Sequence, residues 1–550
     1  MNLLIPVGLY LLALAVRVLA ATELPFPTTE SSAYYVGVAQ NFAGGEGLVA
    51  NGVWSYATPP LEVPKPAFEL WLPMSTFVSA VAMSVLGSSF WAAQVGGALL
   101  GAVVAPLAWA IGREAAHAQG LDSRRGRGVA VTSGLLAAVL SPLVLGSVVP
   151  DSHTPFTVSM LVAALLIPRV IGVRDGHEDV AGPSVLAGLG LGLAMGLAYL
   201  SRQEVIWLGL TVVLMLAWVL RGRAAGTRLR EAVRRLWPVF AGGLVAVVPW
   251  LLRNWVELGS PFPGQAIENL FLVENEDIFA FQDRPDAVTY LGQGPAKVLW
   301  NPVVAAWDNL LNVVVLPAFP VGLAGLIALA GMWRSPALRQ PTALVAVLLS
   351  SLFIFVSTML LFPVATLWGT FMHSSGPLLV SLGVVAALGG DALLARISVA
   401  RGWAKPNVII GPIALVALAG LLMVFQVRVF SEQSHQTEIR YTALAESIAA
   451  VAAAQGQAVP DTLITDHPMW LADATDGYAI ALPDEEVESI VELSELFEAP
   501  WVVVVGERGR YPKALLDSAA AACLSADPTL LTTAGSDAWL FQLTAECPSA

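Results

Sequence analysis

The chain has 550 residues, of which 56% are hydrophobic and only 13% carry a charge. A soluble protein of this length needs more charge on its surface, so the composition excludes that class and indicates a membrane protein with many spans. The net charge of −13 argues against nucleic acid as a partner, although acidic and basic residues are segregated along the chain.

The first apolar run, residues 3–20, is long enough to span a bilayer. Val18-Leu19-Ala20 is similar to the small-residue cleavage site of a secretory signal. However, Met1-Asn2 lacks the basic side chain that precedes the apolar core of such a signal. We therefore expect a retained transmembrane helix.

Further apolar runs bring the predicted number of spans to about eleven. They cover residues 91–112, 128–148, 155–173, 183–200, 204–220, 237–252, 311–332, 341–361, 376–395 and 407–427. The apolar segment 68–87 is not counted, because a crossing there would place the next arginines outside, against the positive-inside rule. Glu69, Trp71 and Pro73 near its start favour a helix that lies in the membrane interface.

With this assignment the basic loops all fall on the cytoplasmic side, together with the N-terminus. They contain Arg113, Arg124, Arg125, Arg127, Arg169, Arg174, Arg221, Arg223, Arg228, Arg230, Arg234, Arg235, Arg334, Arg339, Arg396, Arg401 and Lys405. The opposite side, the predicted outer face, receives acidic loops that include residues 21–90, the short Asp151 loop and residues 253–310.

Residues 428–550 are acidic and have the composition of a soluble domain, so we divide the chain into a membrane domain, 1–427, and a C-terminal domain. Runs rich in β-formers at 462–465, 501–505 and 538–543 alternate with helical stretches at 438–454 and 486–497, which predicts a small α/β fold. An odd number of spans places this domain on the outer face. Its cysteines, Cys523 and Cys547, are compatible with a disulfide or with two separate thiols.

Residues 21–90 are the candidate catalytic loop, because acids and paired tyrosines gather there in an otherwise apolar chain. A carboxylate such as Glu30 can deprotonate an acceptor hydroxyl within hydrogen-bond distance. The alternative is that Glu30 favours the dipole of a helix whose cap is one of Thr28, Thr29, Ser31 or Ser32.

Asp151 and His153 lie in a very short outer loop between two apolar helices. Charged groups near membrane depth are costly and often functional, so the pair could hold a divalent metal, or Asp151 could be a second base. Helix capping by Asp151 or Ser152 is the alternative. Arg202 and Glu204 at the next outer turn could neutralise each other.

Arg253 ends the seventh span at the predicted outer face, where a basic residue breaks the inside-positive trend. A lipid-carrier phosphate is a fitting counter-ion because guanidinium binds phosphate bidentately, whereas snorkelling to lipid headgroups is the alternative. His373 opens the tenth span and is a further phosphate candidate or a core histidine. The chain has no P-loop and no dinucleotide fingerprint, so no nucleotide cofactor is predicted.

Taken together, these stretches resemble the GT-C superfamily of integral membrane glycosyltransferases, in particular the bacterial protein O-mannosyltransferase and aminoarabinose transferase-like branch. The stretches are 33–41, 44–47, the Asp151 loop, 196–204, and 249–254 together with 259–262. The combination of 249–254 with 259–262 is the most specific of them. The expected fold is therefore a polytopic α-helical, GT-C-like membrane domain with an extracytoplasmic α/β domain, in a bacterial inner membrane.

The resemblance implies transfer of a sugar, usually with inversion, from a polyprenyl-phosphate donor to a lipid, glycan or protein acceptor on the outer face. It implies Glu30 and Asp151 as catalytic acids, Arg253, Arg202 and His373 at the donor phosphate, and Tyr34, Tyr35 and Asn254 as substrate contacts. Some members use a divalent ion, for which Asp151 and His153 are the candidates. Relatives usually carry an aspartate three residues before the tyrosine pair, where this chain has Ser31, preceded by Glu30.

Two other functions are compatible with the sequence. One is a transporter or flippase for lipid-linked sugars, which predicts ionisable groups near the middle of the membrane. The candidate residues gather at one face instead, which favours the enzyme. The other is an inactive member that binds a glycolipid, which the Ser31 departure favours.

Overall fold

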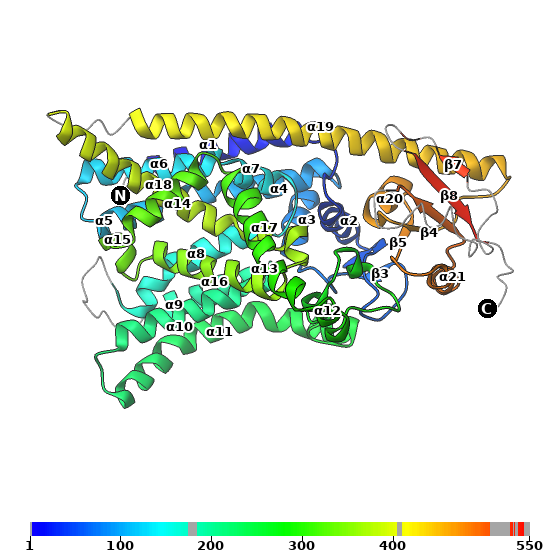
Figure 1. Cartoon of the computed structure of the whole chain (residues 1–550), viewed down its shortest axis with the longest axis horizontal. Helices are drawn as coiled ribbons and strands as arrows, with labels where there is room; N and C mark the ends of the chain where they lie inside the picture. The colour runs from blue at the N-terminus through cyan, green and yellow to red at the C-terminus, as the bar shows by residue number, and fades with distance from the viewer. Residues whose placement is uncertain are drawn as a thin grey trace.

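The computed structural model describes residues 3–173, 184–403, 410–506, 529–531, 533 and 537–543. A body of helices occupies one end of the molecule and a sheet the other, and the long helix α19 (Ile410–Ala454) runs beside both (Figure 1). Arg174, Lys405, Cys523 and Cys547 lie outside the described residues.

Nine of the described helical runs are long and apolar enough to cross a membrane, and a bent pair would make a tenth. They are α1 (Leu4–Ala21), α4 (Phe90–Ala102) with α5 (Val104–Ala118), α8 (His153–Ile171), η1 (Gln203–Val205) with α10 (Ile206–Leu220), α11 (Ala225–Leu258), α13 (Pro295–Asn309) with η4 (Leu310–Val315), α16 (Ala343–Leu361), α18 (Gly376–Ala400) and α19. The bent pair is α6 (Ser123–Val139) with α7 (Ser141–Val148), which meet at 48°. The polytopic helical class is confirmed, and the number eleven stays a prediction.

Three apolar helices are shorter: α3 (Met74–Leu86), α9 (Val185–Tyr199) and α14 (Val321–Met332). The helix α3 represents the segment expected in the interface, and its 13 residues fall short of a bilayer crossing. The helices α9 and α14 stand where full spans were expected. The run 295–310, expected in an outer loop, is instead helical, and η4 covers the start of the span expected at 311–332.

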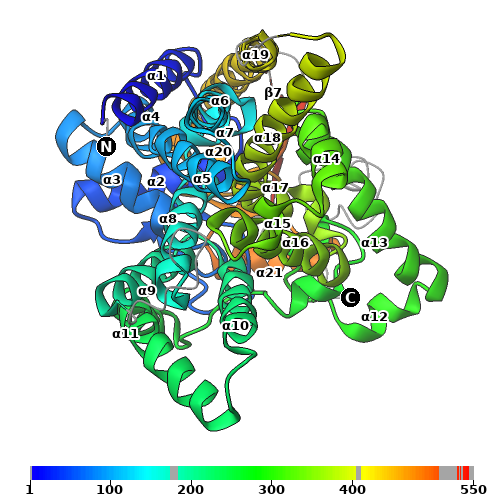
Figure 2. The same ribbon diagram turned by 90° about the vertical axis from the view of Figure 1, so that its left-hand side faces the viewer.

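The remaining described short elements connect these helices. They are α2 (Glu30–Gly44), β1 (Val49–Ala50), β2 (Gly52–Val53), β3 (Lys65–Pro66), η2 (Glu268–Phe271), η3 (Glu276–Phe279), α12 (Ala287–Gly292), α15 (Pro336–Arg339), η5 (Ala365–Trp368) and α17 (Thr370–Ser374). Figure 2 shows the helical body from the end opposite the sheet. The helix α9 packs on α8 and α11, α5 on α6, and α14 on α18.

The end of α5, the start of α11 and the end of α18 lie at the end of the helical body opposite the sheet (Figure 1). Three of the five loops predicted to be basic follow or precede these points. The structure thus separates these three loops from the sheet, as the charge pattern predicts. We call the other end of the helical body its sheet-facing end.

The break between α6 and α7 has a sequence cause in Pro142. Proline has no N–H, and its ring clashes with the carbonyl four residues earlier, so α6 cannot continue through it. Arg17 of α1 is fully buried beside the break and donates to the freed carbonyls, to Ala137 at 3.4 Å and to Ala138 at 3.3 Å. It also donates to Leu143 O at 3.2 Å. The guanidinium therefore satisfies the end of α6 inside the helical body.

The C-terminal sheet has six described strands in the order β2-β5-β4-β6-β8-β7. Its later strands are β4 (Thr462–Thr465), β5 (Tyr478–Ala481), β6 (Trp501–Val504), β7 (Thr529–Leu531) and β8 (Ala538–Gln542). The strands β2, β5, β4 and β6 run parallel, whereas β8 is antiparallel to β6 and to β7. The helices α20 (Pro468–Thr475) and α21 (Val487–Leu496) accompany them, so the predicted α/β region is present.

The edge strand β2 comes from the loop 21–90, which therefore contributes to the same sheet as the C-terminal residues. In addition, α19 passes residue 427 without a break. The division of the chain at 427 stays a prediction, and the loop and the C-terminal region pack together through this sheet.

We expect Arg17→Met to lower the free energy of unfolding by about 3 kcal/mol or more, because several buried carbonyls lose their donor. Thermal unfolding of the purified protein in detergent measures this. Tyr10→Phe on the same helix is the control, since it removes one exposed hydrogen bond to Leu99 O. Equal unfolding temperatures for the two variants would show that Arg17 does not stabilise the break.

Candidate active site

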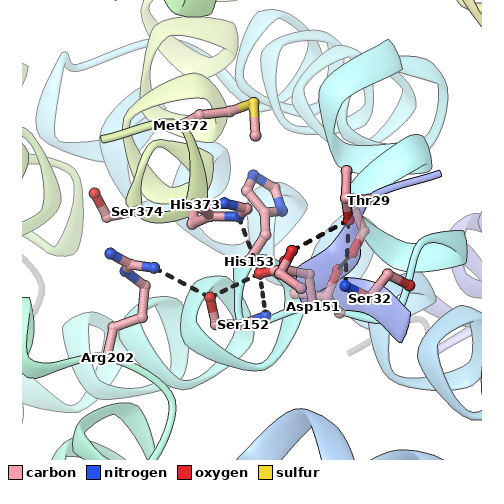
Figure 3. Close-up of polar contacts among 12 residues, drawn as sticks. Thr29, Ser32, Asp151, Ser152, His153, Arg202, Met372, His373 and Ser374 are labelled. Carbon is pink, nitrogen blue, oxygen red and sulfur yellow. Dashed lines mark hydrogen bonds and ion pairs between the residues drawn. The ribbon is translucent and has the colours of Figure 1, made fainter. Parts of the chain in front are cut away.

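Asp151 is the centre of a polar cluster at the sheet-facing end of the helical body (Figure 3). Its Oδ1 accepts bonds from the N–H and, at 2.8 Å, the hydroxyl of Ser152, and contacts His373 Nδ1 at 2.9 Å. Its Oδ2 accepts the Ser31 hydroxyl at 2.9 Å. The turn between α7 and α8, the helix α17 and the start of α2 thus meet at one carboxylate.

Two opposed effects set the pKa of Asp151. Burial by itself raises the pKa, because it disfavours the charged form. The charge and hydrogen bond of His373, together with the two serine hydroxyls, outweigh burial and hold the pKa of Asp151 below its ordinary value. The group is therefore ionised at neutral pH.

Arg202, in the turn between α9 and α10, lies beside this cluster. Its Nη1 donates to Ser152 Oγ at 3.2 Å, and its Nη2 donates to Thr370 O at 3.0 Å. Glu204 pairs with the same guanidinium at 2.5 Å, as the sequence allowed. The structure thus brings Asp151, Arg202 and His373 together, and their predicted roles stay predictions.

His153 packs against neighbouring helices. A Cβ on Gly146 of α7 would lie 2.4 Å from His153 Nδ1, and one on Gly376 of α18 would lie 3.1 Å from Cε1. Glycine at these two positions leaves room for the imidazole, whose nitrogens have no hydrogen-bond partner among the described residues. In these contacts His153 is a packed histidine of the helical body.

The residues present do not fit the metal site suggested for Asp151 and His153. A divalent ion needs several ligands that converge on one point. Within the described ranges, no group of three or more His, Cys, Asp or Glu side chains is placed to hold one. Four donors already occupy the Asp151 carboxylate, and we derive no step through a metal.

Glu30 is the first residue of α2, whose cap is the side chain of Thr29, so the predicted helix start is present and Glu30 lies in its first turn. Its carboxylate is buried and lies against the C-terminal domain. Oε1 contacts His467 Nδ1 at 2.8 Å, and Oε2 accepts the N–H of Met469 at 3.3 Å. Glu30 and Ser31 are adjacent, so the Glu30 contacts and the Asp151 cluster meet at one helix end.

Tyr34 and Tyr35 follow on the same helix and are both buried. The Tyr34 hydroxyl accepts the N–H of Phe68 at 2.6 Å, and the Tyr35 hydroxyl lies at Ser152. Burial raises the pKa of both phenols, so they are neutral. Tyr34 also lines a small cavity of about 10 Å³, room for about one water molecule, with the rings of Trp54 and Trp71.

Lys65 and Glu69 lie in the wall of this aromatic cavity as a buried pair, with Nζ and Oε2 2.6 Å apart. Lys65 also donates to Ser55 O at 3.0 Å. Burial raises the pKa of Glu69 to about 7, although Lys65 opposes the shift. The cavity therefore combines aromatic faces with a titratable pair.

Arg253, near the end of α11, holds the loop that forms this cavity. Its guanidinium donates to Ala67 O at 2.7 Å and to Leu48 O at 3.2 Å, and it lies over the ring of Trp250 at 5.2 Å. The buried Asn254 accepts a further bond at 3.3 Å. Among the described residues, no carboxylate forms an ion pair with Arg253.

The sequence reasoning missed Lys65 and His467. Lys65 is the only basic residue in the acidic loop 21–90, between two prolines, and that contrast was a usable signal. His467 lies two residues after a predicted strand, but its partner Glu30 is 437 residues away, which no local pattern indicates.

No protein-family model matches the chain, and no curated protein matches it by sequence. Solved structures match it in fold. ArnT from Cupriavidus metallidurans in the apo state gives a TM-score of 0.55 at 16% identity over 97% of both chains, and ArnT bound to undecaprenyl phosphate gives 0.53 at 15% over 98% of both. The archaeal oligosaccharyltransferase AglB from Archaeoglobus fulgidus, with an inhibitory peptide and a dolichol-phosphate, gives 0.52 at 14% over 91% of this chain and 69% of AglB. The chain has the GT-C fold, as its resemblance predicts.

The lowered pKa of Asp151 predicts a pH-dependent contribution to stability. The unfolded chain takes up the proton more readily, so the carboxylate stabilises the fold at neutral pH. This effect begins to fall as the pH drops below about 4, the ordinary pKa of an aspartate, and is lost fully only below the lower pKa of the folded state. We expect Asp151→Asn to unfold at a lower temperature than the wild type at pH 7 and pH 5, with a smaller gap near pH 3.5.

Thermal unfolding in detergent at the three pH values measures this gap. Asp461→Asn is the control, because that aspartate is exposed. A gap for Asp151→Asn that is the same at every pH would contradict the ionised, hydrogen-bonded state described above.

Proposed function

We propose that this chain is a membrane glycosyltransferase that moves a sugar from a polyprenyl-phosphate donor to an acceptor on the outer face of a bacterial inner membrane, with inversion. The observation that carries the proposal is the Asp151 cluster, a buried carboxylate held by three elements at the sheet-facing end of a GT-C fold. Solved structures with this fold contain undecaprenyl phosphate or dolichol-phosphate.

The distribution of charge supports this orientation. Three of the five basic loops lie at the end opposite the sheet, and positive loops are retained in the cytoplasm. The sheet and both buried carboxylates would then be extracytoplasmic, where lipid-linked sugars and envelope acceptors meet. Nucleotide sugars are cytoplasmic, so a lipid-linked donor fits this arrangement better.

Glu30 is the proposed base. Although burial opposes them, the contacts with His373, Ser152 and Ser31 hold the pKa of Asp151 below its ordinary value, so it is poorly suited to take a further proton. Its proposed role is to hold Ser31, and with it the start of α2, in place. In the transfer, the acceptor oxygen forms a bond to the anomeric carbon and its proton passes to Glu30. The bond from that carbon to the phosphate oxygen breaks, and its electron pair leaves with the polyprenyl phosphate.

Arg253 is the proposed partner of the donor phosphate. Its guanidinium contacts carbonyl dipoles, the Asn254 amide oxygen and an aromatic ring, and no carboxylate among the described residues forms an ion pair with it, so an incoming phosphate gains a full ion pair.

Transfer from a labelled polyprenyl-phosphate sugar by the purified protein tests the activity. We expect Glu30→Gln to lower kcat by about 100-fold or more, because a general base contributes 10²–10⁴-fold. Asp151→Asn should also lower kcat, through displacement of α2. Glu46→Gln is the control, since Glu46 is exposed in the same loop. If the wild type transfers no sugar from a panel of donors, the proposed function is wrong.

Donor binding tests Arg253 separately. We expect Arg253→Ala to weaken binding of polyprenyl phosphate by about tenfold or more, and Arg253→Lys by less, because lysine keeps the charge without the bidentate geometry. Binding of the phosphate-free polyprenol should not change. Arg401→Ala, at the exposed end of α18, is the control. Equal weakening for polyprenyl phosphate and polyprenol would mean that Arg253 only supports the loop.

A further inference from the structure

The carboxyl ends of the parallel strands in the C-terminal sheet lie against the start of α2. The chain passes from β4 to β5 on one side and later to β6 on the other, so the strand order reverses beside β4. In open α/β sheets, ligands bind outside the carboxyl ends of the strands at such a point. Asp466 and His467 directly follow β4 at this position.

In this protein the start of α2 and the segment before it lie at the carboxyl end of β4. His467 Nδ1 lies 2.8 Å from Glu30 Oε1, and Trp470 Nε1 donates to Pro27 O at 3.0 Å. The N–H of Met469 donates to Glu30 Oε2 at 3.3 Å. One carboxylate of the loop 21–90 is thus held by two groups of the C-terminal domain.

The imidazole of His467 is itself held in place. It is buried and packs against the rings of Tyr441, with centroids 6.4 Å apart, and Trp470, at 5.3 Å. Asp466 fixes the turn, because it accepts the N–H groups of Val505 at 3.0 Å and Gly506 at 3.1 Å. Tyr441 comes from α19, so three parts of the C-terminal region define the imidazole position.

We propose that His467 is a positioning residue of the transferase site, which makes the C-terminal domain part of the catalytic machinery. This inference rests on the proposed function and on Glu30 as its base. The His467 N–H donates to the carboxylate, fixes the direction of its oxygens and stabilises its ionised form. When Glu30 takes the acceptor proton, the same imidazole keeps the carboxyl group oriented.

Two substitutions of His467 separate its hydrogen bond from its bulk. His467→Phe keeps a ring between Tyr441 and Trp470 but removes the donor. His467→Asn keeps an N–H close to the position of Nδ1. We expect His467→Phe to lower kcat by about 10- to 100-fold, the value of one hydrogen bond to a charged group, with KM for the donor within about twofold.

The pH–rate profile distinguishes positioning from a merely structural role. Loss of the donor removes a hydrogen bond that favours the ionised carboxylate, so the acid limb of kcat for His467→Phe should lie at higher pH than that of the wild type. His467→Asn should recover most of kcat. Trp470→Phe is the matched control, because it removes a hydrogen bond of the same junction without contacting Glu30, and its acid limb should stay in place.

The outcomes separate this inference from the proposed function. Wild-type turnover with an unchanged kcat or an unmoved acid limb in His467→Phe would overturn the role of His467 and leave the transferase intact. The same limb shift in Trp470→Phe would also overturn it, because the effect would then belong to the junction as a whole. Absence of turnover in the wild type would overturn both.

Discussion

The position of the candidate site depends on one buried guanidinium. Pro142 ends α6 and leaves its last carbonyls without donors, and Arg17 from α1 satisfies them inside the helical body. Without such a donor, the unpaired carbonyls would make a bend of 48° at this depth costly. The bend sets the direction of α7, and α7 leads directly into the turn that carries Asp151. The Arg17 guanidinium, which does not contact Asp151, therefore fixes the position of the Asp151 carboxylate.

The start of α2 connects that turn to the rest of the site. Successive residues of a helix point about 100° apart, so neighbouring side chains reach different partners. Glu30 contacts the C-terminal domain, Ser31 contacts Asp151, and Tyr34, one turn later, lines the aromatic cavity. The strand β2 from the same loop extends the C-terminal sheet. The loop 21–90 is consequently held from two sides, and a shift of either body would move all three side chains together.

The sequence predicted those features that have a local cause. Apolar runs identified most of the helices, and the strands at 462–465, 501–504 and 538–542 follow their β-formers closely. Asp151, Arg202 and His373 were singled out because polar groups between apolar helices are costly, and they do lie together. The contacts of Glu30 and Arg253 could not be predicted, because their partners are far away in sequence and have no periodic signal. The helix α13 was missed because Lys297, Asn301 and Asp308 interrupt its apolar pattern.

Arg253 differs from the other charged groups around the site in how its charge is compensated. Arg202 is paired with Glu204, Lys65 with Glu69, and each of Asp151 and Glu30 contacts an imidazole. Each of these pairs lowers the cost of burying its charges. Arg253 instead contacts carbonyl oxygens and a tryptophan face, and among the described residues it forms no ion pair. A sugar phosphodiester carries a single negative charge, so its binding would give Arg253 the ion-pair partner that the other charged groups already have. Release of the sugar then leaves a phosphate monoester with additional negative charge, and its retention at the same guanidinium would favour the departure of the leaving group.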